Sequence, residues 1–259
     1  MSSRYGFGYD ELHDDYKLVV IFNIFDDYRD DYASFKTKIK VYSLKTDSWR
    51  SVKDFQGSSL IDCSAKFVKG KLYWTKSATA RAYNSEYGCT IIHFYEYDDG
   101  NRCNIISFDL AYETWGEVEQ PNYGKGKFDL MLGILGGDLV VLCNYEGSHS
   151  DVWLMKYYGV KPSWTTMFAI NCPDDPGKYD YYPRCSLSFS PLFCQLDKGE
   201  ILLLYRSVFM IYNPKDDSIR VIRQPEITKP KSCFQAEIFI ESLVNPLSTA
   251  DQGLVNQED

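Results

Sequence analysis

A pattern of short strand-like runs and tight turns recurs four times along the chain. In three copies a tryptophan follows a small turn, and in the fourth an isoleucine takes its place: Asp47-Ser48-Trp49, Glu113-Thr114-Trp115, Pro162-Ser163-Trp164 and Asp217-Ser218-Ile219. A run rich in β-branched and aromatic residues precedes each copy, at residues 39–44, 105–110, 151–156 and 208–213. A sequence that repeats in this way builds the same small unit several times.

A second recurring turn consists of a glycine followed by a charged residue and an apolar run. It occurs as Gly70-Lys71, Gly137-Asp138 and Gly199-Glu200, and a strand candidate precedes each glycine, at residues 64–68, 130–135 and 185–190. In the first unit the corresponding pair of runs is residues 5–9 and 16–22. Each unit therefore offers four short strands in a fixed order, and the units begin near residues 5, 63, 129 and 185.

Four short strands repeated at a period of roughly 50 to 65 residues are the signature of β-propeller blades. A β-sandwich is the competing all-β fold, but it has no reason to repeat one strand order four times. Helices are not expected over most of the chain, because no long segment places apolar residues at helical spacing between capping residues. We therefore predict an all-β, β-propeller-like fold of about four four-stranded blades.

Residues 234–244, which follow the fourth unit, form a further strand-like segment. The repeat leaves this segment without partners, so we predict an orphan closing strand and expect its partner strands upstream of Met1. The last residues are polar and predict disorder. We expect one domain over residues 1–246, truncated at its N-terminus, and a disordered tail over residues 247–259.

The charge balance limits the classes of partner. The net charge is -8, with 28 basic and 36 acidic residues. Without a basic stripe, neither nucleic acid nor a membrane surface is an expected partner. No apolar run approaches the ~18 residues of a membrane span, and the N-terminus has no apolar signal-peptide core. The 8 cysteines include no Cys-x-x-Cys pair. This predicts reduced thiols rather than a zinc site, and a cytoplasmic and/or nuclear location.

Several short motifs occur in a defined order, beginning with Gly6-Phe7-Gly8-Tyr9-Asp10. The others are residues 15–19, 41–50, 70–74, 106–110, 151–160, 212–214 and 241–244. In this order the motifs resemble the F-box-associated domain of plant F-box proteins, which include the F-box/kelch-repeat and S-locus F-box proteins. The resemblance spans about residues 5–246 and implies a kelch-like propeller.

The resemblance also implies a function. It suggests the substrate-recognition part of a Skp–cullin–F-box ubiquitin ligase receptor, in which an N-terminal F-box binds a Skp-type adaptor and this domain captures a target protein. The chain begins at the Gly-Phe-Gly-Tyr motif and contains no F-box. We therefore expect a fragment, a truncated paralogue or a short gene model. The adaptor and the cullin are expected partners only if an F-box is supplied upstream, and no residue here is assigned to them.

Residues that could carry chemistry are scattered. His13, His93 and His149 fall in different units, and no Gly-x-Ser-x-Gly motif is present. The acidic run 26–32 could suggest Ca²⁺, but it lacks the glycine and glutamate positions of an EF-hand and is interpreted as a solvated loop. Residues 124–127 (Gly-Lys-Gly-Lys) could suggest phosphate binding, but the Walker spacing is incomplete. We predict no catalytic, cofactor-binding or metal-binding residue, and no cofactor.

The repeated tryptophans and the long loops are the remaining candidates for a binding site. Trp49, Trp115 and Trp164 could stack on a ligand, but repetition at blade spacing favours packing between blades. Binding sites on repeated scaffolds usually lie on variable loops. The long loops are residues 26–35, 77–89, 95–102, 122–127, 144–150 and 172–183, and their candidate anchors are Tyr28, Tyr32, Tyr83, Tyr87, Tyr179, Tyr181 and Tyr182.

Two classes of function are left open. The first is a protein-interaction domain that captures a target through its inter-strand loops and is not an enzyme. The alternative is a propeller-fold carbohydrate-binding protein or enzyme, because propellers host both and a fold alone does not decide function. The absence of convergent histidine, cysteine and carboxylate groups in the sequence favours the first class.

Overall fold

The computed structural model describes most of the four predicted units. The described residues are 2–25, 35–53, 55, 59–60, 64–77, 80–84, 90–94, 103–124, 128–145, 149–158, 163–171, 192–196, 198–205 and 208–222. Every regular element among them is a β-strand. In this part of the chain no helix is long and apolar enough to cross a membrane. The predicted closing strand 234–244 and the tail 247–259 lie outside the described residues.

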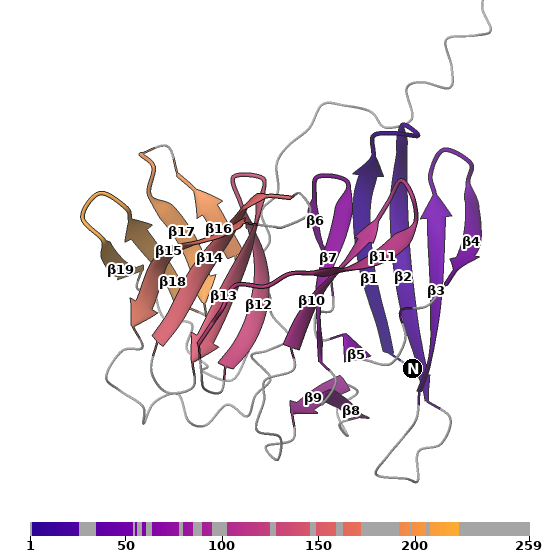
Figure 1. The fold of residues 1–259 in the computed structure, drawn as a ribbon, viewed down its shortest axis with the longest axis horizontal. Helices are drawn as coiled ribbons and strands as arrows, with labels where there is room; N and C mark the ends of the chain where they lie inside the picture. The colour runs from indigo at the N-terminus through magenta and orange to yellow at the C-terminus, as the bar shows by residue number, and fades with distance from the viewer. Residues whose placement is uncertain are drawn as a thin grey trace, which may run out of the picture.

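Apart from one two-stranded hairpin, the described strands form four antiparallel sheets, which we call blades 1 to 4 (Figure 1). Blade 1 contains β1 (Ser2–Asp10), β2 (Asp15–Phe25), β3 (Phe35–Ser43) and β4 (Ser48–Val52). Blade 2 contains β5 (Ser59–Leu60), β6 (Lys66–Val68), β7 (Lys71–Ser77), β10 (Cys103–Asp109) and β11 (Thr114–Val118). Blade 3 contains β12 (Phe128–Leu135), β13 (Asp138–Tyr145), β14 (His149–Tyr157) and β15 (Ser163–Asn171). Blade 4 contains β16 (Leu192–Gln195), β17 (Ile201–Tyr205), β18 (Val208–Asn213) and β19 (Ser218–Ile222).

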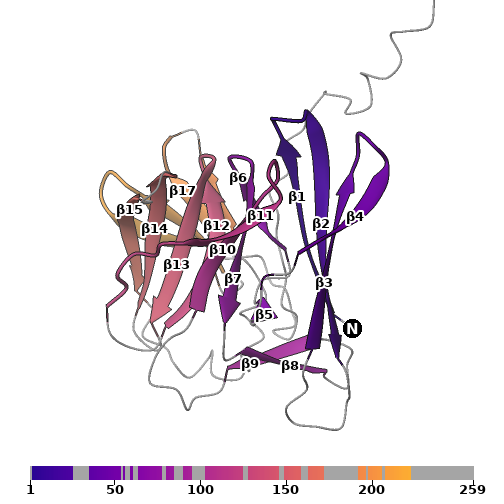
Figure 2. The same ribbon diagram turned by 45° about the vertical axis from the view of Figure 1, so that its right-hand side comes forward.

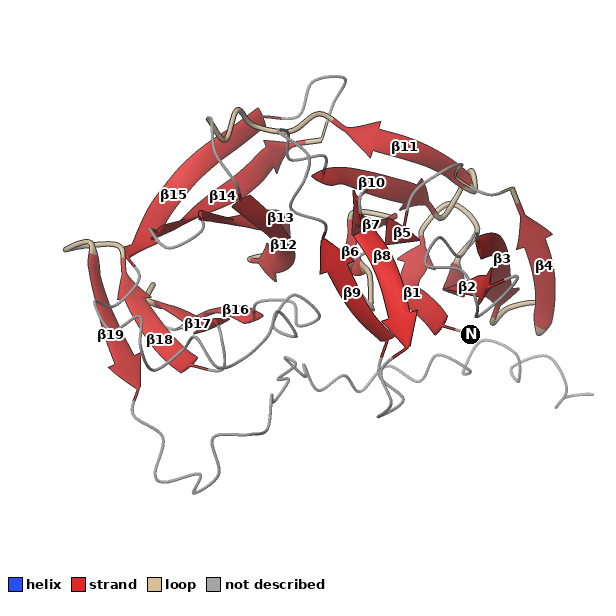
Figure 3. Cartoon of the chain, turned by 90° about the horizontal axis from the view of Figure 1, so that it is seen from below, coloured by secondary structure: helices blue, strands red, loops and turns tan. Residues whose placement is uncertain are grey.

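The blades follow one another around an axis, and β1, β6, β12 and β16 lie on the inner side of their blades (Figure 3). The β-propeller fold predicted from the repeat is therefore confirmed. Blade 2 differs from the prediction because β5 and β6 both pair with β7, which gives five strands. The segment 77–89, expected to be a loop, contains β8 (Ala80–Asn84), which pairs with β9 (Thr90–Phe94) in a separate hairpin.

The core consists of three apolar layers between neighbouring blades. Residues of β2, β7 and β10 form the first layer, between blades 1 and 2. Along β13 the side chains alternate: Leu139 and Val141 pack toward blade 2, while Val140 and Leu142 pack toward blade 4. This period of two is the normal consequence of strand geometry. It explains why the central strands are apolar on both faces.

Two glycines of β1 bring this strand close to blade 2. A Cβ atom built on Gly8 would lie 2.8 Å from Leu110 Cδ1 and closer still to the ring of Phe67. One built on Gly6 would lie 2.8 Å from Ala65 Cβ. Both distances are below ordinary van der Waals contact, so this part of the Gly-Phe-Gly-Tyr motif permits close packing between blades.

Tryptophans of the outer strands connect blades in sequence. Trp115 packs against Phe55 and Phe108, and its indole N–H donates to the carbonyl of Lys53, the residue after β4, at 3.1 Å. Trp164 donates in the same way to the carbonyl of Glu119, the residue after β11, at 2.8 Å. The predicted packing between blades is confirmed for these two.

For Trp49 the predicted packing between blades is wrong. Its side chain is 50% exposed and contacts Tyr42 of its own blade, with the ring centroids 5.1 Å apart. No described blade precedes blade 1, so the indole lacks the neighbour that covers the other two tryptophans.

Candidate functional site

Four hairpin turns at one end of the blades share a local structure. They lie between β1 and β2, β3 and β4, β10 and β11, and β18 and β19. The fourth turn residue has a positive φ in every case: 52° at Asp14, 46° at Asp47, 54° at Glu113 and 55° at Asp217. The residue that ends the first strand accepts backbone N–H groups of the turn. Asp109 Oδ1, for example, accepts from Ala111 at 3.0 Å and from Tyr112 at 3.1 Å. This is the geometry that Asp, Asn and Ser favour in turns.

In three of these turns a tyrosine hydroxyl donates to the carboxylate of the fourth turn residue. The pairs are Tyr9 with Asp14, Tyr42 with Asp47, and Tyr212 with Asp217. The hydrogen bond to Asp14, assisted by burial and by the negative charge nearby, raises the pKa of Tyr9 to about 12. The carboxylates of Asp14, Asp47 and Asp217 are therefore engaged within their own hairpins.

The β10–β11 turn departs from this pattern. Phe108 stands where the other turns have tyrosine, and Glu113 stands where they have aspartate. Without a tyrosine hydroxyl beside it, the longer Glu113 side chain reaches blade 1. Its Oε1 lies 3.2 Å from Lys17 Nζ, and its Oε2 accepts from Arg50 Nε at 2.8 Å. The turn of blade 2 is thereby bound to the strands of blade 1.

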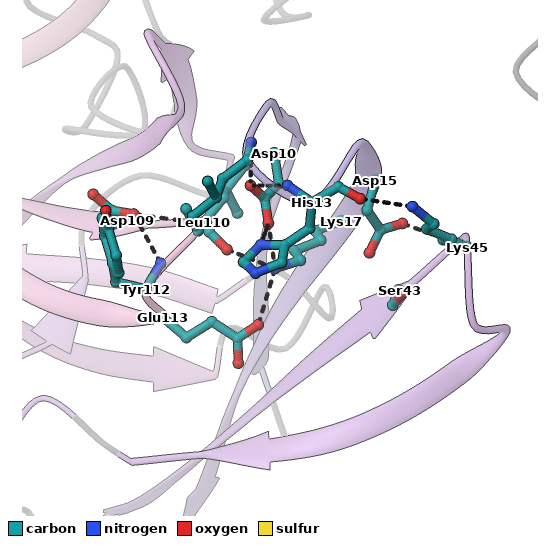
Figure 4. A network of polar contacts seen from close by, with 12 residues as sticks. Asp10, His13, Asp15, Lys17, Ser43, Lys45, Asp109, Leu110, Tyr112 and Glu113 are labelled. Carbon is teal, nitrogen blue, oxygen red and sulfur yellow. Dashed lines mark hydrogen bonds and ion pairs between the residues drawn. The ribbon is translucent and has the colours of Figure 1, made fainter.

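Lys17 is the centre of this inter-blade network (Figure 4). Its side chain is almost fully buried, and its Nζ lies 2.7 Å from Asp10 Oδ2 and 2.7 Å from the carbonyl oxygen of Leu110. Asp10 Oδ2 also lies 2.7 Å from His13 Nδ1. Burial alone would raise the pKa of Asp10, but hydrogen bonds from Lys17 and His13 outweigh it and lower this pKa. The charges are therefore paired, and they fix the relative position of two turns.

An open cleft of about 530 Å³ lies beside the network, between the β1–β2, β6–β7 and β10–β11 turns. Leu12 and Tyr112 line it and expose 63% and 72% of their surface. Its other lining residues are Asp10, Glu11, Lys69, Gly70, Asp109 and Ala111. The charged groups include Asp109, which pairs with Lys71 at 3.3 Å, and Lys69, which pairs with Asp138 at 2.7 Å. A cleft with two exposed apolar side chains on hydrogen-bonded turns is suited to binding rather than to proton transfer.

The three histidines are not brought together. His13 lies at the turn end, beside Asp10. His149 begins β14 at the opposite end of the sheets, where its ring stacks on Tyr145 with the centroids 4.5 Å apart. His93 lies in β9, in a separate hairpin. Among the described residues, no three His, Cys, Asp or Glu side chains form a group that could hold a metal ion.

The other sequence candidates fall largely outside the described part of the chain. This holds for the acidic run 26–32, for residues 125–127, and for the side chains of all seven candidate tyrosines. The strands that flank the long loops place their ends opposite the tight turns, as Figure 1 shows for β2–β3 and β13–β14. Leu12 and Tyr112 were not predicted from the sequence, because they lie on short turns and not on the long loops. The available signal was an apolar or aromatic residue inside a short polar turn.

Comparison with known proteins identifies the family. A family model described as the F-box associated beta propeller domain matches residues 1–245. The chain belongs to this family. The resemblance noted from the motifs is thereby confirmed.

Two relatives from Arabidopsis thaliana illustrate the match. F-box protein CPR1 is 30% identical over 250 residues, which cover 93% of this chain and 55% of that protein. F-box/kelch-repeat protein At3g23880 is 26% identical over 246 residues, which cover 93% of this chain and 56% of that protein. The chain thus spans about half the length of these relatives. The solved structure titled Structure of YjhT covers 85% of this chain, and this chain covers 84% of it, with a TM-score of 0.38 and 12% identity. That likeness is too remote to bear on fold or function.

Proposed function

We propose that this F-box-associated domain is the substrate-recognition part of a Skp–cullin–F-box ubiquitin ligase receptor and captures a target protein. The observation that carries the proposal is the family match over residues 1–245, together with relatives that are named F-box proteins. An F-box supplied upstream would contact the Skp-type adaptor and through it the cullin. A ligase of this kind places the domain in the cytoplasm and/or the nucleus.

The turn-end cleft is the surface that we propose for target binding. Tyrosine is enriched among the residues that dominate binding energy at protein interfaces, and Tyr112 stands beside a second exposed apolar residue, Leu12. Both lie on tight turns that the Lys17 network holds in place, so binding costs little additional ordering of the backbone. A cleft of this size accommodates side chains of a partner rather than a whole element.

The alternative, a carbohydrate-binding propeller or an enzyme, gains little support from the same cleft. Of the three carboxylates that line the cleft, Asp10 and Asp109 are engaged by lysines and by backbone N–H groups, which leaves Glu11 alone for proton exchange. Glu113 is bound to Lys17 and Arg50. A general acid or base needs a group that is free to exchange a proton with a substrate. Capture of a protein remains the better interpretation.

Differential capture from cells tests the proposal. The tagged 259-residue chain is compared with the double variant Leu12→Ala/Tyr112→Ala and with Tyr157→Ala, a tyrosine of equal exposure on β14 (71%). We expect a partner that wild type and Tyr157→Ala recover equally, that the double variant loses, and that accumulates when the proteasome is inhibited. Recovery of the same partners by all three chains contradicts the cleft. The ligase role is contradicted if the partners that the double variant loses do not become more abundant when the proteasome is inhibited.

A further inference from the structure

The first strand of blade 3 shows how an inner strand is covered in this propeller. On one face of β12, Leu130 and Leu132 are buried against blade 2, and on the other face Met131 and Leu135 are buried against blade 4. An inner strand between two blades therefore carries apolar residues on both faces, and both faces are removed from water.

The first strand of blade 1 is covered on one face only. Gly6 and Gly8 of β1 pack against blade 2, but Tyr5 and Phe7 on the other face are 48% and 56% exposed. Figure 2 shows this sheet at one end of the described blades, with no described strand packed on its outer face. Trp49 of β4 lies on the same sheet and lacks the preceding blade that Trp115 and Trp164 contact. The outer face of blade 1 thus has the composition of an inter-blade surface.

We propose that residues 234–244 of this chain pack on this face over β1, as the first strand of a fifth blade. They lie outside the described residues, and their sequence and their place in the chain support this position. Along the chain, an outer strand precedes the inner strand of the next blade: 9 residues separate β11 from β12, and 20 residues separate β15 from β16. After β19, 11 residues separate Ile222 from residue 234, which is a spacing within this range.

The sequence of the segment fits that position. Residues 236, 238 and 240 are Ala, Ile and Ile, and they share one face of an extended strand. The opposite face carries Glu237, Phe239, Glu241 and Leu243. The segment is therefore apolar on both faces, as β12 is, and one face also carries two carboxylates.

Charge complementarity selects the face that turns toward blade 1. Lys40 pairs with Val20 across β2 and β3, and Val20 pairs with Tyr5, so Lys40 shares the exposed face with Tyr5. Lys38 lies two residues away on the same face, and both lysines are exposed. The Glu237 and Glu241 side of the segment is the complementary one, with Phe239 set against Phe7.

Site-specific photo-crosslinking of the full 259-residue chain tests the proposal. Benzoylphenylalanine replaces Phe7 in one chain and Trp49 in the other, and crosslinked peptides are mapped by mass spectrometry. We expect an intramolecular link from position 7 to residues 234–244. Position 49 is the matched control, because β4 lies about 14 Å from β1 at the usual strand spacing and one strand over β1 does not reach it. It should give no link to that segment.

Every other result overturns the proposal. These results are a link from position 7 to a second copy of the chain, a link to another segment, no link at all, or equal linking of residues 234–244 from both positions. A charge exchange provides the second measurement. Glu237→Lys/Glu241→Lys should reduce the yield from position 7 at least about fivefold, and added Lys38→Glu/Lys40→Glu should restore it. An unchanged yield in the first of these chains shows that the carboxylates do not face blade 1.

Discussion

The ammonium group of Lys17 is surrounded by three oxygen atoms that come from both blades it joins. Its partners Leu110 and Glu113 lie more than ninety positions away in the sequence. The sequence shows that Phe108 and Glu113 depart from the tyrosine–aspartate pattern of the other turns. It does not show what the Glu113 carboxylate contacts, because that depends on how blade 2 is placed against blade 1. The contacts between Lys17 and Glu113 can therefore be identified from the three-dimensional structure but not from the sequence.

Replacing Lys17 should be strongly destabilising. Lys17→Met leaves the buried Asp10 carboxylate without its main counter-charge, and breaking a buried ion pair in this way costs about 3–5 kcal/mol. Lys156→Met, at an exposed position on β14, should change the free energy of unfolding by less than about 0.5 kcal/mol. Urea denaturation monitored by tryptophan fluorescence measures both. Equal midpoints for the two variants would show that the network contributes nothing.

The lowered pKa of Asp10 gives the network a pH dependence of defined sign. Because the folded pKa lies below the ordinary value of 3.8, the ionised carboxylate contributes stability above that value, and this contribution is lost as the pH falls through the folded pKa. The difference in unfolding free energy between wild type and Asp10→Asn should therefore be constant above about pH 5 and should shrink as the pH falls below about 4. In a Lys17→Met background the difference should vary much less with pH. A difference that stays constant in wild type would contradict the assignment.

At the scale of elements, the strands and hairpins were largely predictable. Strand runs and turn residues lie next to each other in the sequence, and the turn chemistry of Asp, Asn and Gly is local. The glycines of the Gly-charged motif have positive φ, as at Gly70 (76°) and Gly199 (79°). The hairpin β8–β9 was missed because its run is short and lies inside a polar segment. The different environments of Trp49 and Trp115 could not be read from the repeat, since the repeat is the same at both positions.

That difference gives a prediction for the two tryptophans. Trp115→Ala removes a ring packed among Phe55, Trp74 and Phe108 and a hydrogen bond to blade 1, and should destabilise by about 3–5 kcal/mol. Trp49→Ala removes a half-exposed ring and should cost less than about 1 kcal/mol. Chemical denaturation at matched concentrations compares them. If the two losses are equal, the inter-blade role of Trp115 is wrong.

At the scale of the whole molecule, the number and order of blades followed from the period of the repeat. A unit of four short strands cannot bury both of its faces alone, so consecutive units must stack around a common axis. The surface that such stacking creates at the turn end was not predictable. Leu12 and Tyr112 lie a hundred residues apart, and only the packing of blade 1 on blade 2 places them in one cleft. The long loops, which composition favoured, connect strands at the other end.

Target capture through this cleft is the central claim, and the affinity of the full chain for its target tests it most directly. Once a partner has been identified by differential capture, its Kd is measured for wild type, Leu12→Ala/Tyr112→Ala and Tyr157→Ala. Loss of two interface anchors should weaken binding at least about thirtyfold, which corresponds to about 2 kcal/mol, while Tyr157→Ala should stay within about twofold of wild type. Equal Kd values for wild type and the double variant would contradict the claim.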